Sequence, residues 1–573
     1  MRPTLPIAFA LALAACDEER ITFTDGAAFV DAATDIAPTA PGAACGTNEQ
    51  GEPLGGCSAG QYCVSPQEGF PNGYCAPDCR VAPCPAGSVC YPASTLHHYC
   101  LRGCARDSDC RVREGYVCRT WNPGFAPGCI PNDEPVGRRD GRACFATDSD
   151  GGVGPFLAPL PAVRFTSPSV GLSRAMLGTE AEAEPSIALD GRGGAVVSFM
   201  GVDTRSYWRG GVVRIAPDGS ASAPLIVHDY DYPNVYQPTV AFDRAGTLHL
   251  VYVADFADRP GNFLRHTVSH DGGATVERAV SVFTDIACGL GCNAPVLAVG
   301  PDGTGDAVYA GAVGGRRDGS TVLSVARRAV DAAAFDLEVV IAALEVDGMQ
   351  RRAPGIAALS AGPVAGEVTA AWVMRNLDNA QSSLGDRINR VRVRSSTDGG
   401  RTWGETSDAT RAGDAPVAQV PWVARAAGVT HVVYVTGGVL GVWDVVLATR
   451  RDGASAWQHR VVNDDPERCA THAFAGLAVD GATGDAFVLW LDNRYDQAVA
   501  AAARCPADAS QRCERNERVP GEPFVLSTTH DPLRWHGTRS ALALAPDGAL
   551  FAAWSDTRTG GPGVYLARGR AAP

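Results

Sequence analysis

The sequence of 573 residues contains no lysine, so all 49 of its basic residues are arginines. This absence excludes every mechanism that depends on a catalytic lysine. Acidic residues also outnumber basic ones, so the formal net charge is −14. Such a balance excludes the electrostatic attraction by which most proteins hold nucleic acids. We therefore expect no nucleic-acid partner.

Several signatures of enzymes and metal sites are missing too. There is no Walker phosphate-binding loop, no G-x-S-x-G nucleophile turn and no H-E-x-x-H zinc motif. The glycine-rich stretch 191–194 lies in a predicted hairpin turn and does not precede a helix, so it is not a phosphate cradle. The stretch 148–152 resembles the start of a calcium loop but lacks the distal glutamate. We expect no cofactor and no metal ion.

Beyond the N terminus no run reaches the roughly 18 apolar residues that a membrane span needs. The first residues read as a secretory signal, with Arg2 followed by a short apolar run from Leu5. The run ends Leu-Ala-Ala-Cys, which resembles the lipobox of bacterial lipoproteins. The resemblance implies that residues 1–15 are removed and that Cys16 is lipidated, which would anchor the protein to a membrane of the cell envelope, facing the periplasm or the exterior. The alternative is an ordinary cleaved signal.

Cysteines are crowded into one segment. Residues 16–44 are poor in apolar periodicity and are predicted to form a flexible tether. Residues 45–145 then hold 13 of the 19 cysteines, 12 of them in three groups of four. Pairs with the C-x₂-C spacing of zinc sites are absent, so in an exported protein the segment is predicted to be a disulfide framework. Each group allows three connectivities. The groups are Cys45, Cys57, Cys63 and Cys75; Cys79, Cys84, Cys90 and Cys100; and Cys104, Cys110, Cys118 and Cys129.

After a linker over 146–162, residues 163–573 repeat one pattern. Hydrophobic residues make up 45% of the chain, and its 65 glycines and 39 prolines suit many short strands joined by turns. Each copy begins with a hairpin whose second strand carries a large aromatic residue, and successive copies start between 52 and 68 residues apart. This spacing is typical of four-stranded propeller blades. The copies start at Pro185, Pro238, Pro295, Pro354, Pro421, Ala473 and Ala541.

A turn motif occurs in the second half of one copy. Residues 396–403 follow the pattern Ser-x-Asp-x-Gly-x-Thr-Trp, in which Ser396, Asp398, Gly400, Thr402 and Trp403 are the defining positions. The pattern resembles the Asp-box, or BNR repeat, of sialidase-like β-propellers. Weaker copies stand at the same phase from residues 216, 269 and 450. The alternative is an ordinary Asp-Gly hairpin.

Together these patterns predict an all-β protein with a seven-bladed β-propeller preceded by a small disulfide-rich segment. The seventh copy lacks a fourth strand, which residues 163–172 could supply to close the ring. Sialidases have six blades, so a six-bladed ring with one inserted hairpin is the alternative.

The resemblance places ligand sites on the face opposite the motif turns. Loops there repeat an Asp–Arg pattern that includes Arg205, Arg494 and Arg558, and repetition favours structural turns over catalysis. The inter-blade loops are less regular and combine acids with aromatics, as sugar sites do. Our candidate ligand-binding residues are Asp229, Tyr230, Arg205, Arg494, Arg558, Trp535 and His536.

A sialidase also needs an arginine triad, a tyrosine nucleophile and an acid. The family's Arg-Ile-Pro element is absent, and the nearest candidate at Arg164 does not match it. Tyr232, Tyr236 and Asp231 are the weak catalytic candidates. We therefore expect a lipid-anchored module that binds a glycan or a protein without catalysis; the alternative is a diverged exo-sialidase-like glycoside hydrolase.

Six cysteines lie outside the groups and Cys16. Short separations predict that Cys288 pairs with Cys292 and Cys505 with Cys513. Cys144 and Cys469 are left, and we expect them to pair and to clamp the linker to the propeller. Non-reducing peptide mapping should recover a cross-linked Cys144–Cys469 peptide, whereas a free thiol at either position contradicts this pairing.

Overall fold

The computed structural model describes residues 43–131 and 163–571, apart from short internal stretches of which the longest are 65–73, 173–181, 284–292, 377–388 and 525–538. The described residues form strands joined by turns, with no α-helix among them. None of them belongs to a helix long and apolar enough to cross a membrane.

The N-terminal part consists of short hairpins held by disulfides. Four strand pairs form it: β1 (Gly46–Thr47) with β2 (Pro53–Gly55), β3 (Tyr62–Val64) with β4 (Tyr74–Ala76), β5 (Ser88–Pro92) with β6 (His98–Arg102), and β7 (Tyr116–Arg119) with β8 (Gly128–Pro131).

Each four-cysteine group has the same connectivity, first to third and second to fourth. The bonds are Cys45–Cys63, Cys57–Cys75, Cys79–Cys90, Cys84–Cys100, Cys104–Cys118 and Cys110–Cys129. The sequence allowed three patterns. The hairpins set Cys63 opposite Cys75, Cys90 opposite Cys100 and Cys118 opposite Cys129, and none of these facing pairs is bonded, which excludes the pattern that joins third to fourth. Of the two patterns that remain, all three groups have the same one. These bonds indicate an oxidising compartment.

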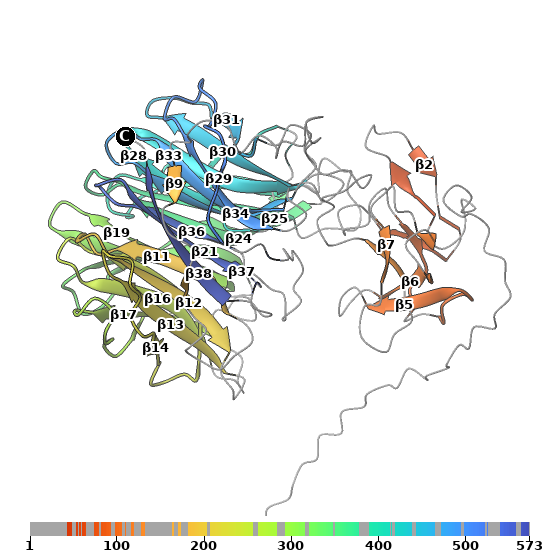
Figure 1. Ribbon diagram of the computed structural model, residues 1–573, viewed down its shortest axis with the longest axis horizontal. Helices are drawn as coiled ribbons and strands as arrows, with labels where there is room; N and C mark the ends of the chain where they lie inside the picture. Colours follow the sequence, from red (N-terminus) through yellow and green to blue (C-terminus); the bar gives the residue numbers. More distant parts are fainter. Residues whose placement is uncertain are drawn as a thin grey trace, which may run out of the picture.

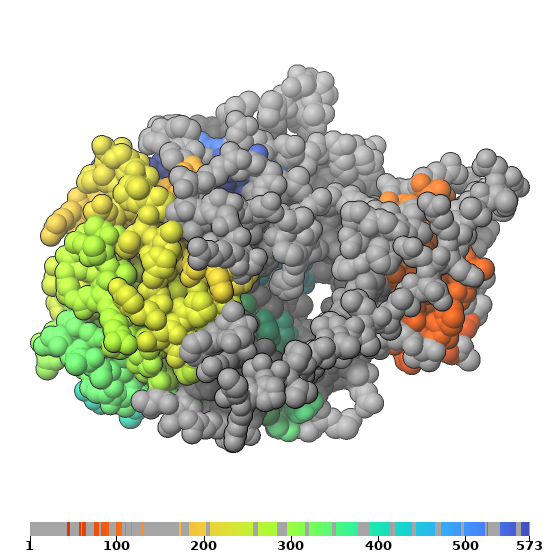
Figure 2. All heavy atoms as spheres, turned by 90° about the horizontal axis from the view of Figure 1, so that it is seen from below, coloured from red at the N-terminus to blue at the C-terminus, as the bar shows by residue number. Residues whose placement is uncertain are grey.

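The larger part is a ring of seven antiparallel sheets, which confirms seven blades and not six (Figure 1). Blades 1 to 3 are β11 (Glu182–Leu189), β12 (Ala195–Val202), β13 (Trp208–Ile215) and β14 (Leu225–Val227); β15 (Asn234–Phe242), β16 (Leu248–Asp255), β17 (Asn262–Ser269) and β18 (Val280–Ser281); and β19 (Asn293–Pro301), β20 (Asp306–Gly315), β21 (Thr321–Ala329) and β22 (Leu337–Ala343). Their outer surfaces, yellow to green, lie side by side in Figure 2.

Blades 4 to 6 continue the ring, and blade 4 carries one additional short strand, β23 (Glu345–Asp347). The others are β24 (Gln350–Ala361), β25 (Val368–Asn376), β26 (Arg390–Ser396) and β27 (Ser407–Asp408); β28 (Trp422–Ala426), β29 (Val429–Gly437), β30 (Trp443–Arg451) and β31 (Gln458–Val461); and β32 (His472–Val479), β33 (Ala486–Asp492), β34 (Val499–Cys505) and β35 (Glu517–Arg518).

Blade 7 combines both ends of the propeller segment. Its own strands are β36 (Ala541–Leu544), β37 (Ala549–Asp556) and β38 (Gly563–Ala571). The outer position is filled by β9 (Val163–Phe165) and β10 (Val170–Gly171), which both pair antiparallel with β38. The strand that the seventh copy lacked therefore comes from the segment before blade 1, as the sequence predicted.

The core is divided into seven layers, one between each pair of neighbouring blades. The aromatic residue that recurs in the sequence lies in six of these layers. The layer between blades 2 and 3 contains Phe283 as its largest buried side chain, and the layer between blades 3 and 4 contains two of the recurring aromatics. The recurring aromatic stands on the second strand of each blade and is fully buried in all seven: Phe199, Tyr252, Tyr309, Trp372, Tyr434, Trp490 and Trp554. Each of these aromatic residues is a wedge between two blades, and burial of its ring stabilises that interface.

The two faces of the ring differ in the connections that they carry. Turns between the first and second strands and between the third and fourth strands lie on one face, which we call the turn face. Gly399 on one such turn donates its N–H to Gly366 on the other. The loops between the second and third strands and between blades lie on the opposite face, which we call the loop face.

Buried histidines predict acid sensitivity of the propeller. His431 on β29 is fully buried, with Nε2 2.8 Å from the Gly484 carbonyl and Nδ1 3.0 Å from Thr449 Oγ1. Burial lowers its pKa from 6.5 to about 4. The unfolded chain therefore binds this proton first, so stability present above pH 6.5 is lost as the pH falls towards 4, by on the order of 3 kcal/mol.

We expect the urea midpoint of the propeller to fall between pH 7 and pH 4.5. His431→Asn should flatten this dependence, and replacement of the exposed His228 by Asn should leave it unchanged. An unaltered slope in His431→Asn would refute the assignment.

Candidate functional site

Arginines from three neighbouring strands meet at the loop-face end of blade 4. Arg351 and Arg352 begin β24, Arg375 lies near the end of β25, and Arg390 begins β26. Ladder pairing sets Arg352 opposite Asn376 and Met374 opposite Arg390, which fixes the four at one end of the sheet. We call these four residues the blade-4 arginine cluster. It is a local concentration of positive charge in a strongly acidic chain.

Acidic residues of β23 neutralise part of this cluster. Glu345 lies opposite Arg352 in the ladder, and Asp347 lies opposite Gln350. Glu345 also forms an ion pair with Arg392, farther along β26, at 3.6 Å. The acidic residues of this sheet end therefore lie on β23, and the one opposite Arg352 is Glu345.

Arg375 differs from Arg351 and Arg352 in having no partner, and from Arg390 in the burial of its guanidinium. Among the described residues it makes no hydrogen bond and no ion pair, and its Nε is buried without an acceptor. Its side chain crosses from β25 onto the innermost strand, where a Cβ on Gly355 would lie 2.9 Å from Nε. A larger residue than glycine would displace it. Burial lowers the pKa of Arg375, and no described anion offsets that burial.

Arg539, which lies just before β36, is by contrast paired with a carboxylate. Arg539 of blade 7 is buried, with Nε 3.3 Å from the Glu184 carboxylate of blade 1. Its Nη2 also lies 3.3 Å from Thr239 Oγ1 of blade 2. One side chain therefore spans three consecutive blades. Burial lowers the pKa of Arg539, and the charge of Glu184 opposes that shift, so this residue acts as a brace of the ring.

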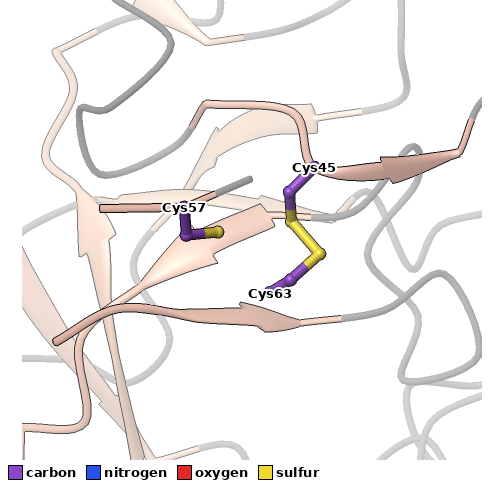
Figure 3. Close-up of side chains that lie close together, drawn as sticks. All are labelled: Cys45, Cys57 and Cys63. Atoms are coloured by element: carbon purple, nitrogen blue, oxygen red, sulfur yellow. A yellow bond between two sulfur atoms is a disulfide. The ribbon is translucent and has the colours of Figure 1, made fainter. Parts of the chain in front are cut away.

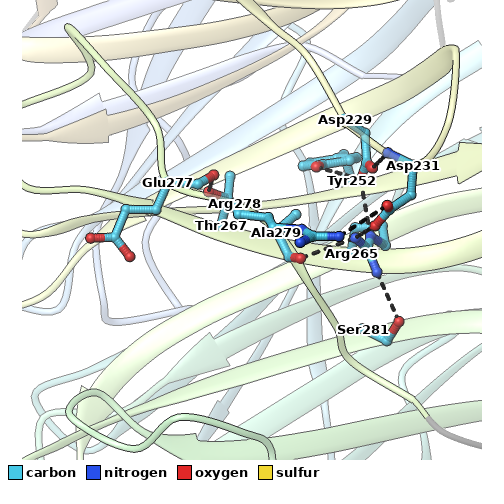
Figure 4. A network of polar contacts seen from close by, with 9 residues as sticks. All are labelled: Asp229, Asp231, Tyr252, Arg265, Thr267, Glu277, Arg278, Ala279 and Ser281. Carbon is cyan, nitrogen blue, oxygen red and sulfur yellow. Dashed lines mark hydrogen bonds and ion pairs between the residues drawn. The ribbon is translucent and has the colours of Figure 1, made fainter.

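The acidic loop between blades 1 and 2 is held by hydrogen bonds and ion pairs to residues of blade 2 (Figure 4). Asp229 Oδ2 accepts hydrogen bonds from the Tyr252 hydroxyl at 2.8 Å and from Arg265 Nε at 2.9 Å. Arg265 Nη2 reaches Asp231 at 2.9 Å, and Arg278 reaches the same carboxylate at 3.2 Å. Asp414 repeats the arrangement in blade 5, where it accepts from Tyr434 at 2.6 Å. The repetition indicates that these aspartates clip inter-blade loops to the blades.

The catalytic candidates of this loop are not activated as nucleophiles. Burial and the nearby Asp255 carboxylate raise the pKa of Tyr236, and burial raises that of Tyr232. Both shifts oppose formation of a phenolate. Asp231 is held in ion pairs with Arg265 and Arg278, whereas Tyr230 is 79% exposed and available to a ligand.

The Asp–Arg pattern forms internal turn supports where it is described. Asp556 is fully buried and accepts from the Trp554 indole at 2.8 Å and from Arg558 Nε at 2.9 Å. The Arg558 guanidinium lies 4.1 Å from the centre of the Tyr565 ring. Asp492 in blade 6 likewise accepts from the Trp490 indole. Arg205, Arg494, Trp535 and His536 lie outside the described residues, as do Cys16, Cys144, Cys288, Cys292 and Cys469.

The turn at residues 396–403 is held by its own side chains. Ser396 Oγ donates to Asp398 and accepts from the Gly400 N–H at 2.9 Å. Asp398 accepts from the N–H and the hydroxyl of Thr402, and the Trp403 indole donates to the Gly400 carbonyl. Burial acts to raise the pKa of Asp398, but the hydrogen bonds from Thr402 lower it to about 2. A disulfide between Cys505 and Cys513 spans the corresponding turn of blade 6.

Cysteine sulfurs form the groups of potential metal ligands found among the described residues. One group consists of Cys45, Cys57 and Cys63 (Figure 3). Because these sulfurs are joined in disulfides, they have no thiolate to offer a metal ion.

No known family model matches the chain, and no curated protein matches it. Similar solved structures include a Dyadobacter fermentans protein of unknown function, 12% identical, covering 72% of this chain and 100% of its own, with a TM-score of 0.42. An ulvan lyase bound to a GlcA–Rha3S saccharide is 12% identical over 70% and 95% of the two chains, with a TM-score of 0.46. A Hadza microbial sialidase is 13% identical over 61% and 68%, with a TM-score of 0.39.

These likenesses concern the propeller and identify neither a ligand nor a reaction for the chain. Sequence reasoning missed the blade-4 arginine cluster. A signal was present, since Arg351 and Arg352 lie just before the repeat start at Pro354, separated from it by one residue. Arg375 lies near the end of the second strand of the same copy. Only the pairing of the strands brings these positions together.

Proposed function

We propose that the protein is an envelope lipoprotein whose propeller binds an acidic glycan, without catalysis, through the blade-4 arginine cluster. The observation that carries this proposal is the buried Nε of Arg375, which has no acceptor among the described residues. A buried cation without a partner is destabilising, and such groups are retained where a ligand supplies the counter-charge. The planar guanidinium matches carboxylates and sulfates.

Glycan binding is favoured over glycoside hydrolysis by the state of the tyrosines. The raised pKa values of Tyr232 and Tyr236 disfavour a phenolate nucleophile. A tyrosine beside a carboxylate, as Tyr236 is beside Asp255, is nevertheless the pairing that a sialidase-like enzyme needs. Hydrolysis of a sialoside is therefore the alternative to binding without catalysis, and it has to be tested separately.

Replacement of Arg375 by Gln separates binding from structural support. We expect the purified full-length chain to bind acidic glycans on an array, and Arg375→Gln to weaken this binding by about tenfold or more, as loss of a charge-assisted hydrogen bond does. The thermal midpoint should stay equal or rise, because an uncompensated buried charge is removed. Arg570→Gln, an exposed arginine on the turn face, is the charge-matched control.

Two outcomes would contradict this assignment. One is a lower thermal midpoint of Arg375→Gln with unchanged glycan binding, which would make Arg375 structural. The other is hydrolysis of a fluorogenic sialoside that Tyr236→Phe abolishes, which would establish the glycosidase alternative.

The membrane anchor is a separate part of the proposal. It rests on the Leu-Ala-Ala-Cys end of the signal segment, together with the disulfides that indicate an oxidising compartment. In cells fed a labelled fatty acid, the full chain should carry the label and sediment with membranes, whereas Cys16→Ser should lose both properties. Labelling that persists in Cys16→Ser would contradict lipidation at this residue.

A further inference from the structure

The turn face carries a groove between blades 1 and 2 with a volume of about 650 Å³. Its walls come from both blades: the turns at Asp190 and Ser220 of blade 1, and those at Thr247 and Asp271 of blade 2. This volume lies within the range of small-ligand sites. The groove is on the face opposite the blade-4 arginine cluster, so it is a different site and does not depend on the function proposed above.

The carboxylates that line the groove are consumed by their own turns. Asp190 Oδ1 accepts from the N–H groups of Arg192 and Gly194, at 2.7 and 2.8 Å. Asp271 accepts four hydrogen bonds from the side chains and backbone of its turn. The hydrogen bond from the Thr275 hydroxyl is the foremost cause that lowers the pKa of Asp271. Both carboxylates therefore accept hydrogen bonds within their own turns, which leaves them poor partners for an arginine.

Two exposed guanidinium groups on the wall have no partner among the described residues. The side chains of Arg192 and Arg214 make no hydrogen bond or ion pair there, and only backbone groups of these residues are engaged. Both lean towards glycines of blade 2. A Cβ on Gly246 would lie 3.9 Å from Arg192 Nη2, and one on Gly273 would lie 3.7 Å from Arg214 Cγ. Because both glycines have positive φ values, the turns require them and leave space for the two arginines.

The remaining lining suits a sugar. Phe242 is half-buried and contributes an apolar surface to the lining, and Thr247 brings a hydroxyl group. A pyranose presents an apolar face together with hydroxyls, and an acidic one adds a carboxylate or sulfate that a guanidinium binds in a bidentate manner. An acidic peptide would satisfy the arginines but would not need the aromatic wall.

We propose that this groove binds an acidic oligosaccharide of about two or three residues, whose carboxylate or sulfate groups are held by Arg192 and Arg214. The ligand spans the junction of two blades, so its binding also joins them. The two guanidinium groups determine that the ligand is acidic. Comparison of a carboxylated with a sulfated saccharide distinguishes the two acidic groups.

Calorimetry on the full-length chain tests this with three probes: trigalacturonate, a sulfated disaccharide of chondroitin, and neutral galactotriose. Arg192→Gln/Arg214→Gln should weaken binding of the preferred acidic probe by at least about tenfold. Hydrogen exchange should show ligand protection at residues 243–247 and 269–275, which the double variant loses. Arg570→Gln serves again as the control, and Arg375→Gln separates the two sites because it should leave this binding and this protection intact.

Three results would overturn the groove assignment. They are binding of galactotriose as tight as that of the acidic probes, acidic binding that the double variant retains, and absence of binding by the unaltered chain. Loss of all acidic binding in Arg375→Gln alone would place the ligand on the loop face, which supports the proposed function and refutes the groove. Tighter binding of a tri-glutamate peptide than of either acidic saccharide would replace the sugar by a peptide.

Discussion

The antiparallel pairing of β9 and β10 with β38 is the contact on which the rest of the propeller depends. Without it, blade 7 would have three strands and an exposed edge, and the first and last blades would be joined only by side-chain packing. With it, β9, β10 and β38 belong to one sheet. Closure then makes each blade the neighbour of two others, so that all seven apolar layers are covered on both sides.

Closure also explains where polar groups can be placed. The seven aromatic wedges fill six of the layers between blades and Phe283 lies in the seventh, which leaves the strand ends as the positions at which charge is tolerated. At most of these ends charge is neutralised within the protein. Asp229 and Asp414 clip inter-blade loops, Asp556 holds its own turn, and Arg539 braces three blades through Glu184 and Thr239. Arg375 at one face and the Arg192–Arg214 pair at the other depart from this rule, and both proposals rest on that departure.

The sequence motif that resembles an Asp-box has a narrower role than a catalytic signature. The turn at Ser396–Trp403 uses its serine, aspartate and threonine on one another, and its tryptophan indole on the Gly400 carbonyl. The copy at Ser269–Thr275 uses the same bonds of serine, aspartate and threonine, without the tryptophan. In blade 6 a disulfide spans the corresponding turn. These are several local solutions to one requirement, a tight third-to-fourth-strand connection, and they say little about the chemistry of the opposite face.

The sequence by itself determined the recurring aromatic positions and predicted seven blades and the closing segment, and the structure excluded the six-bladed alternative. Each of these three features follows from a periodic pattern that local physics enforces: alternation in strands, turn residues between them, and an aromatic at one position of each copy. The disulfide connectivity and the two arginine sites were decided only by the tertiary structure. Hairpin pairing chose which cysteines face one another. Whether Arg375 or Arg214 has a partner depends on strands far apart in the chain, because only packing decides which carboxylates are already in use.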